Sequence, residues 1–324
     1  MGSTGLVVSR LALGTMTWGR DTDEHDAREQ LATFSEAGGT LIDTADVYAD
    51  GASERLLGSM LNDVVPRDSV VLASKAVSRP GTDRRFDASR GHLLSSLDAS
   101  LKRLGTDYLD LWQLHAWDPR TPLAETLAAI DDAVRSGRVR YVGVSNYSGW
   151  QTASAATWQR AVTGRTPLAS TQVEYSLLQR GVEREVLGAA QELGLGILAW
   201  SPLGRGVLTG KYRTGTPADS RAASPHFIEF VRPFLDERCR SVVEAVVTAA
   251  GGLGVSPLEV ALAWVRDRPG VASAIVGARN AAQLKGSLAV EGLELPEEIR
   301  LALDEVSALP LGYPDQGWNL SANA

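Results

Sequence analysis

Cysteine is almost absent from this sequence: Cys239 is the only one among 324 residues. A single thiol cannot form an intrachain disulfide, and it cannot build a cysteine-rich metal site. Such scarcity is typical of proteins from reducing compartments. Histidine is also scarce, with four in the chain, and no H-x-x-H or H-E-x-x-H spacing occurs. We therefore expect no metal site.

Long apolar runs are missing as well. No stretch reaches the roughly 18 uninterrupted apolar residues that a membrane helix needs, and the first residues lack the pattern of a secretory signal. We therefore expect a cytoplasmic protein that does not contact a membrane. A net charge of -7 argues against a non-specific nucleic-acid binder, which normally carries a basic face.

A third absence concerns the glycine-rich fingerprint of dinucleotide-binding sheets. The first expected strand leads into Gly14 to Gly19, whose spacing differs from G-x-G-x-x-G. Strand-length apolar runs alternate with amphipathic segments throughout the chain. Strands are expected to start near Arg10, Thr40, Ser69, Tyr108, Val139, Ala169, Gly196 and Val271.

Eight β/α units favour an α/β fold of the (β/α)8 TIM-barrel type over a doubly wound open sheet. We expect one domain over residues 1–324, with a short N-terminal hairpin and a C-terminal helix plus tail. Helices are predicted over residues 23–37, 53–65, 89–104, 122–136, 148–162, 184–193, 235–250, 257–268, 280–290 and 296–309. Residues 210–232 interrupt the alternation and are expected to form a long mobile loop of the kind that covers binding sites.

Ionisable side chains follow three successive strands. Asp43 and Tyr48 come after the second, Lys75 ends the third and His115 ends the fourth. In a parallel barrel these ends meet at one mouth, where barrel enzymes carry their chemistry. A lysine ammonium held by Asp43 would lower the pKa of Tyr48, and His115 would hydrogen-bond a substrate oxygen. The set suits reduction of a carbonyl group.

Other interpretations of these residues remain open. A single buried Lys–Asp pair or a single histidine at a strand end is more often structural, although four such residues at three strand ends favour a site. A barrel aldolase would use Lys75 as a Schiff-base amine. A neighbouring Asp43 disfavours that role, because it keeps the lysine charged.

At this level of detail the chain resembles the aldo-keto reductases along nearly its whole length. The resemblance rests on the opening Thr4 to Arg10 segment followed by Leu13-Gly14-Thr15-Met16, and on Asp43, Tyr48, Lys75 and His115 in the order of the family's catalytic tetrad. It rests further on Gly143-Val144-Ser145-Asn146, on Thr171 to Ser176, and on Trp200-Ser201-Pro202-Leu203-Gly204-Arg205-Gly206.

The resemblance implies an NADPH-dependent reductase of aldehydes or ketones, with Tyr48 as the general acid, Asp43 and Lys75 tuning it, and His115 orienting the carbonyl. It implies substrate contacts for Trp18, Tyr48, His115 and Trp117. Cofactor contacts are implied for Thr15, Met16, Asp43, Ser145, Asn146, Gln172, Trp200, Ser201, Pro202, Leu203, Gly204, Lys211, Arg221, Gly277, Arg279 and Gln283.

Within this resemblance, Arg279 beside a helix N-terminus is expected to hold the adenosine 2′-phosphate and so to favour NADP over NAD. Gly286 and Ser287 stand where many relatives have an acid and an asparagine, which weakens the expected adenine contacts. The Trp-Ser-Pro-Leu motif also occurs in potassium-channel β subunits of the superfamily. A cofactor-binding sensor or accessory subunit is therefore the alternative. The carbonyl substrate (small aldehyde, ketosugar or natural-product ketone) and the oligomeric state stay open.

Overall fold

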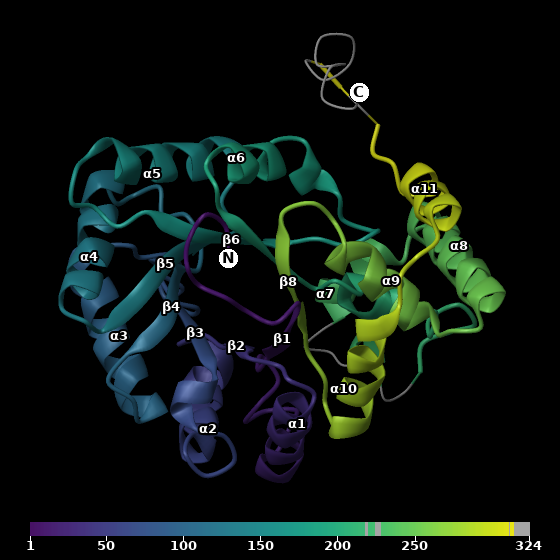
Figure 1. The fold of residues 1–324 in the computed structure, drawn as a ribbon, viewed down its shortest axis with the longest axis horizontal. Coiled ribbons are helices and arrows are strands. Elements are labelled where there is room, and N and C mark those ends of the chain that lie inside the picture. The colour runs from purple at the N-terminus through teal and green to yellow at the C-terminus, as the bar shows by residue number, and fades with distance from the viewer. Residues whose placement is uncertain (218–219, 224–227, 311, 314–324) are drawn as a thin grey trace.

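The expected barrel is present in the computed structural model, which describes residues 1–217, 220–223, 228–310 and 312–313. Within these residues the strands close in chain order, and each strand is parallel to both neighbours (Figure 1). The strands are β1 (Leu11–Gly14), β2 (Leu41–Asp43), β3 (Val71–Ala76), β4 (Leu109–Leu114), β5 (Val139–Ser145), β6 (Leu168–Glu174), β7 (Gly196–Trp200) and β8 (Val271–Val276).

Helices surround the strands, with α1, α2 and α10 on one side and α5 and α6 on the opposite side (Figure 1). Their ends carry the signals expected from the sequence, such as the Ser256–Glu259 capping box that begins α9 and Gly105 after α3. The helices are α1 (Glu24–Glu36), α2 (Ala52–Met60), α3 (Arg90–Leu104), α4 (Leu123–Arg135), α5 (Gly149–Ala161), α6 (Val186–Glu192), α7 (Ile228–Val231), α8 (Glu237–Leu253), α9 (Pro257–Arg266), α10 (Ala281–Leu288) and α11 (Glu297–Val306).

The barrel interior is layered, and the two-residue period of a strand explains the layers. Leu41, Ala73 and Leu111 belong to a small buried apolar cluster inside the barrel. The side chains two residues further along the same strands are Asp43, Lys75 and Gln113. Successive side chains alternate between the two faces of a sheet, so these polar groups enter the interior one layer above, toward the carboxyl ends.

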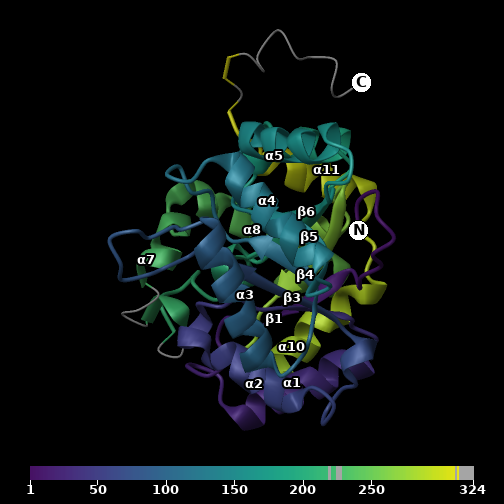
Figure 2. The same cartoon turned by 90° about the vertical axis from the view of Figure 1, so that its left-hand side faces the viewer.

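The N-terminal hairpin prediction was wrong, because residues 1–10 contain no strand. The side chain of Ser9 accepts hydrogen bonds from the backbone N–H groups of Thr40 (2.9 Å) and Leu41 (3.3 Å), so a side chain, and not strand pairing, ties this segment to the start of β2. Met1 and Val8 instead pack against the inner apolar cluster and close that end of the barrel. Figure 2 shows the N-terminal segment and α7 at opposite ends of the barrel.

The helix predicted over residues 53–65 ends earlier, at Met60. Leu61 is extended, and Asn62 takes a positive φ of 66° and pairs its backbone N–H with the carbonyl of Val65. Asparagine tolerates this left-handed conformation better than most residues, so a tight turn replaces the last helical turn. The predicted C-terminal tail lies outside the described residues from Pro314 onward, including Trp318.

No single helix in the described ranges is both long and apolar enough to cross a membrane. Only α8 and α9 taken together meet that length and composition, and the pair is bent by 102°.

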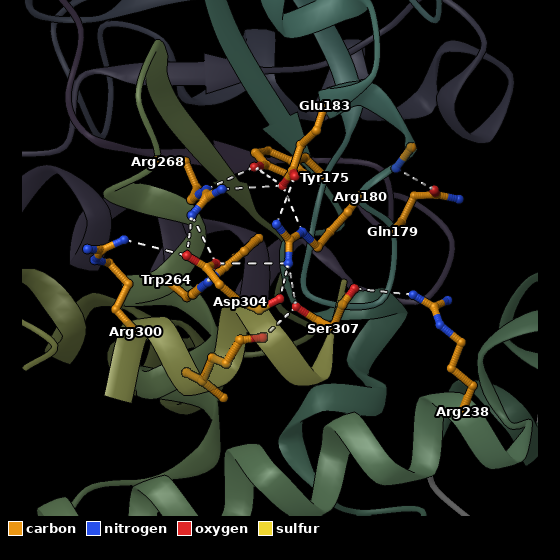
Figure 3. Close-up of polar contacts among 12 residues, drawn as sticks. Tyr175, Gln179, Arg180, Glu183, Arg238, Trp264, Arg268, Arg300, Asp304 and Ser307 are labelled. Atoms are coloured by element: carbon orange, nitrogen blue, oxygen red, sulfur yellow. Dashed lines mark hydrogen bonds and ion pairs between the residues drawn. The ribbon is translucent and has the colours of Figure 1, made fainter. Parts of the chain in front are cut away.

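A polar network fastens α11 to α9 and to the loop after β6 (Figure 3). The Asp304 carboxylate accepts hydrogen bonds from Trp264 Nε1 (2.9 Å) and from the Arg268 guanidinium (3.0 and 3.1 Å). Arg180 donates to the Asp304 carbonyl (2.7 Å) and to Ser307 Oγ (2.9 Å). Removing the carboxylate would leave a largely buried indole N–H and a largely buried guanidinium without this acceptor.

We predict that Asp304→Ala lowers the free energy of unfolding by about 2 kcal/mol, because donors left unpaired in a mostly buried site cost more than the bonds contribute. Denaturant unfolding followed by circular dichroism measures the change. Arg300→Gln is the matched control, since Arg300 contacts the same carboxylate at 3.5 Å from a more exposed position. Equal effects of the two substitutions would contradict the assignment of Asp304 as the centre of the network.

Candidate active site

Tyr48 is placed by a turn that follows β2. Residues Ala49, Asp50 and Gly51 all have positive φ (47°, 53° and 79°), which reverses the chain before α2 begins. Such a run is unfavourable for the two residues that are not glycine. The turn leaves Tyr48 beside the end of β3, where Lys75 points into the barrel.

Lys75 is fully buried and makes three polar contacts. Its ammonium donates to Asp43 Oδ2 at 2.6 Å, to the Thr44 carbonyl at 2.8 Å and to the Tyr48 hydroxyl at 3.3 Å. A buried ammonium has three protons to satisfy, and this arrangement uses all three. The tyrosine hydroxyl therefore lies directly against a positive charge.

The second oxygen of Asp43 is held by two glutamines from more distant strands. Gln172 Nε2 on β6 donates to Asp43 Oδ1 at 2.8 Å, and Gln113 Nε2 on β4 approaches the same atom at 3.4 Å. Gln113 was not among the predicted site residues. The signal was present in the sequence, because Gln113 lies two residues before His115, but its pairing with Lys75 in the sheet register depends on the fold.

The charge state of this group follows from burial and from neighbouring charges. Burial alone would lower the pKa of Lys75, but the Asp43 carboxylate and Tyr48 raise it more, so the net pKa lies above the usual value and the ammonium persists. Burial raises the pKa of Tyr48, and Lys75 offsets only part of that rise. Lys75 therefore lowers the pKa of Tyr48 as expected, but burial outweighs it, and the net pKa lies above the usual value.

His115 follows β4 and faces Tyr48, with the two rings edge to face at 6.0 Å. Burial, followed by the Lys75 charge, lowers the pKa of His115 to about 3, so the imidazole is neutral. Its Nδ1 atom is buried and has no hydrogen-bond partner among the described residues. The residue also lines the cleft beside Tyr48, so an N–H of the neutral ring that faces the cleft can donate to the oxygen of a ligand.

Asp46 adds a titratable carboxyl next to this group. Burial and then the nearby Glu54 carboxylate raise its pKa, against the opposing charge of Arg103, to about 7. Glu54 is itself satisfied by Ser74 Oγ (2.6 Å) and by the Arg103 guanidinium (2.7 Å to Nε). Asp46 Oδ1 is buried and has no partner in the described part of the chain.

A second chain of hydrogen bonds links the ends of β4, β5 and β7. Trp200 Nε1 donates to Asn146 Oδ1 at 3.1 Å, and Asn146 Nδ2 donates to the His115 carbonyl at 2.9 Å. Ser145 Oγ donates to the Gln172 carbonyl at 3.0 Å. Asn146 adopts a positive φ of 58°, which asparagine accepts at low cost. The indole of Trp200 is therefore fixed at the barrel mouth.

These side chains open into one cleft of about 550 Å³, a volume typical of small-molecule sites. Most of the predicted cofactor residues line it together with Tyr48 and His115. Those residues are Thr15, Met16, Asp43, Ser145, Asn146, Gln172, Trp200, Ser201, Pro202, Leu203, Lys211, Gly277, Arg279 and Gln283.

Five predicted residues are not among those that line the cleft. Lys75 is one of them, because it is fully buried and contacts the Tyr48 hydroxyl. Trp18 is fully buried and donates its Nε1–H to Gln30 Oε1 at 3.2 Å, so it packs against α1 and not against a substrate. Trp117 packs edge-on against Tyr147. Gly204 is buried beside the cleft. The Arg221 side chain lies outside the described part of the structure.

The cleft also has lining residues for which the sequence predicted no ligand contact. Gly14, Arg205 and Gly206 belong to the motifs quoted above, whereas Thr17, Thr209, Phe230, Leu258, Ile275 and Val276 were not singled out. Gly286 and Ser287, discussed above for the adenine contacts, line the cleft at the α10 side. Phe230 comes from the predicted loop over residues 210–232, which contains the short helix α7. Its distance in sequence from any recognisable motif explains the omission.

Comparison with known proteins agrees with this geometry. The model of the aldo/keto reductase family matches residues 10–308. The chain is 38% identical to an uncharacterized oxidoreductase, YrpG, of Bacillus subtilis, over 98% of each chain. It is 33% identical to the aldo-keto reductase YhdN of the same organism, over 95% of this chain and 94% of the relative.

A further relative is a probable voltage-gated potassium channel subunit beta of rice. It is 36% identical, and the alignment covers 94% of this chain and 93% of the relative. These matches span the strand ends that carry Asp43, Tyr48, Lys75 and His115 as well as the cleft around Trp200. The chain therefore belongs to the aldo/keto reductase family, and it is an oxidoreductase of that family.

Proposed function

We propose that this protein reduces the carbonyl group of an aldehyde or ketone with NADPH, and that Tyr48 is the general acid. The observation that carries the proposal is the buried Lys75 ammonium, 3.3 Å from the Tyr48 hydroxyl and fixed by Asp43. A proton donor against a positive charge can release its proton to a developing alkoxide, because the charge stabilises the tyrosinate left behind.

The cleft has the groups that a nicotinamide dinucleotide requires. It has an indole face at Trp200, amide and hydroxyl groups at Ser145, Asn146 and Gln172, and cationic side chains at Lys211 and Arg279. Aromatic faces stack on flat rings, and cations bind phosphates. When bound, the cofactor supplies a hydride to the carbonyl carbon.

The remaining steps belong to the residues of this chain. Neutral His115 hydrogen-bonds the carbonyl oxygen and aligns it with Tyr48, which donates its proton to that oxygen. Asp43 keeps Lys75 charged and oriented while the tyrosinate forms, and Gln172 holds Asp43 in place. A Schiff-base role for Lys75 is disfavoured, because Asp43 and Tyr48 hold it in the charged form, which is not nucleophilic.

The alternative function is that of an NADPH-binding sensor or accessory subunit with little turnover. The similarity to the rice potassium channel β subunit supports it. Purified protein titrated with NADPH and then with NADH, followed by cofactor oxidation with a panel of aldehydes, ketones and ketosugars, separates the two. Oxidation with some carbonyl supports the reductase, and tight binding without turnover on any compound supports the sensor.

We predict that Tyr48→Phe lowers kcat for carbonyl reduction by at least about 100-fold, because it removes the proton donor. The NADPH dissociation constant, measured by quenching of tryptophan fluorescence, should stay within about threefold of wild type, because the indole of Trp200 and the phosphate-binding cations are untouched. Near-normal turnover in this variant would remove Tyr48 as the acid.

Asp46 should impose a pH dependence on reduction. Its pKa of about 7 means that it loses a proton as pH rises through neutrality. The resulting anion raises the pKa of Tyr48, which makes proton donation less favourable.

We therefore expect kcat/KM for the carbonyl substrate to fall as pH rises through about 7, and we expect Asp46→Asn to flatten this part of the pH profile. His115, with a pKa of about 3, should add no break there. Superimposable profiles for wild type and Asp46→Asn would contradict the assignment.

Arg279 should set the preference between the two nicotinamide cofactors. We expect Arg279→Leu to weaken NADPH binding by about tenfold or more and to change NADH binding little, since only NADPH carries the additional phosphate. Isothermal titration with both cofactors measures this difference. Lys285→Leu is the matched control, because Lys285 is a cation on α10 that does not line the cleft. A parallel loss of both cofactors in Arg279→Leu would overturn the role.

A further inference from the structure

Arg205 is a cleft residue that the proposed chemistry does not use, and its guanidinium is fixed to the barrel. Nε and Nη2 each donate to one oxygen of Glu174, both at 2.7 Å. Glu174 is the last residue of β6 and does not line the cleft. Both side chains are mostly buried, with 14% and 13% of their surfaces exposed. A bidentate pair of this kind fixes orientation as well as position.

The same guanidinium also holds the segment of residues 228–234. Its Nη1 donates to the carbonyl of Phe230, and its carbon lies 3.9 Å from the centre of the Phe230 ring and 4.8 Å from that of Phe234. These are hydrogen-bond and cation–π contacts to two aromatic residues of one segment. Arg205 is thus a bridge between the rim of the barrel and a segment inserted between β7 and α8.

The backbone around Arg205 is unfavourable for an arginine. Its φ of 59° lies in the left-handed region, between Gly204 at 54° and Gly206 at 91°. A residue other than glycine is strained in such a position. The contacts with Glu174 and Phe230 are what hold the arginine there, and they depend on this backbone to aim the side chain.

The segment held by Arg205 forms part of the cleft wall. The rings of Phe230 and Trp200 are nearly parallel, with centroids 6.5 Å apart and an angle of 12° between their planes. Both rings line the cleft. Displacement of residues 228–234 would therefore open the wall next to the indole on which the nicotinamide is proposed to stack.

We propose that Arg205 is a positioning residue that fastens residues 228–234 to the barrel rim through Glu174, and that this attachment sets how fast NADPH leaves the cleft. The inference rests on the proposed function for the identity of the ligand. It adds a role for Glu174 and Arg205 in retaining the cofactor, separate from proton transfer at Tyr48.

Three variants test the attachment. Glu174→Gln removes the charge of the barrel partner and keeps its shape, whereas Arg205→Met removes the guanidinium. Arg213→Met is the matched control, because Arg213 forms the same two-bond pair with Glu244 (2.7 and 2.6 Å) but is more exposed and does not line the cleft. Circular dichroism establishes that each variant is folded, and Glu174→Gln carries the test if Arg205→Met does not fold.

The first measurement is amide hydrogen exchange in cofactor-free protein. We expect exchange at residues 228–234 to accelerate by about tenfold in Glu174→Gln and Arg205→Met, and to stay at the wild-type rate in Arg213→Met. Unchanged exchange in both test variants would overturn the attachment. This result does not depend on the cofactor, so it stands apart from the proposed function.

The second measurement is the rate of NADPH dissociation from the full-length protein in a stopped-flow chase followed by tryptophan fluorescence. We expect an increase of about tenfold in both test variants. The single-turnover rate of NADPH oxidation at saturating cofactor should stay within about twofold of wild type in Glu174→Gln, because Glu174 contacts neither the cleft nor Tyr48.

The outcomes separate the two ideas. Faster exchange without faster NADPH release, or a turnover step that falls as much as release rises, would overturn the role in cofactor retention. If the wild-type protein binds NADPH but oxidises it with no carbonyl compound, the proposed reductase activity is wrong, and the NADPH-release experiment still tests the role of Arg205. If the wild-type protein binds no NADPH, both the reductase activity and the role in cofactor retention are wrong.

Discussion

The buried ion pair between Asp43 and Lys75 is the interaction on which the rest of the site depends. Removing two charges from water is costly, and a pair survives in a barrel interior only if its remaining hydrogen-bonding capacity is satisfied. Gln172, Thr44 and Tyr48 supply those bonds. The residues of the polar layer above the inner apolar cluster therefore depend on one another. If one of them were removed, a buried hydrogen-bonding group of another would lose its partner.

This requirement explains how the barrel divides its interior. The lower layer is apolar and is closed by Met1 and Val8, so it stabilises the fold by removing apolar surface from water. The upper layer lies at the carboxyl ends of the strands, where loops can reach it, and it carries the titratable groups. Burial lowers the pKa of His115 and raises that of Tyr48, so the histidine is neutral and the tyrosine is protonated. Burial alone would also lower the pKa of Lys75, but the Asp43 charge raises it more, so the lysine stays charged.

The long insertion between β7 and α8 adds an aromatic wall to the cleft, which the strand ends alone do not form. It brings Phe230 to the cleft and gives Arg205 a second anchor besides Glu174. The strand ends thus hold the titratable groups in rigid positions, whereas the proposed cofactor end of the cleft is built largely from loops. Loops on a rigid scaffold are where binding properties can differ between relatives that share a fold. The similarity both to oxidoreductases and to a channel subunit fits that division.

The sequence by itself determined the barrel, the order of its elements and the meeting of Asp43, Tyr48, Lys75 and His115 at one end of it, because apolar periodicity, helix caps and polar residues at strand ends are local signals. It did not determine the N-terminal segment, the end of α2 or the surroundings of Trp18 and Trp117, since these depend on which surfaces the folded barrel leaves to be covered. Only the tertiary structure decided that Gln113 and Gln172 meet Asp43, that burial outweighs Lys75 in setting the pKa of Tyr48, and that Arg205 joins Glu174 to Phe230. Each depends on distance and desolvation between residues far apart in the chain, quantities that no local pattern encodes.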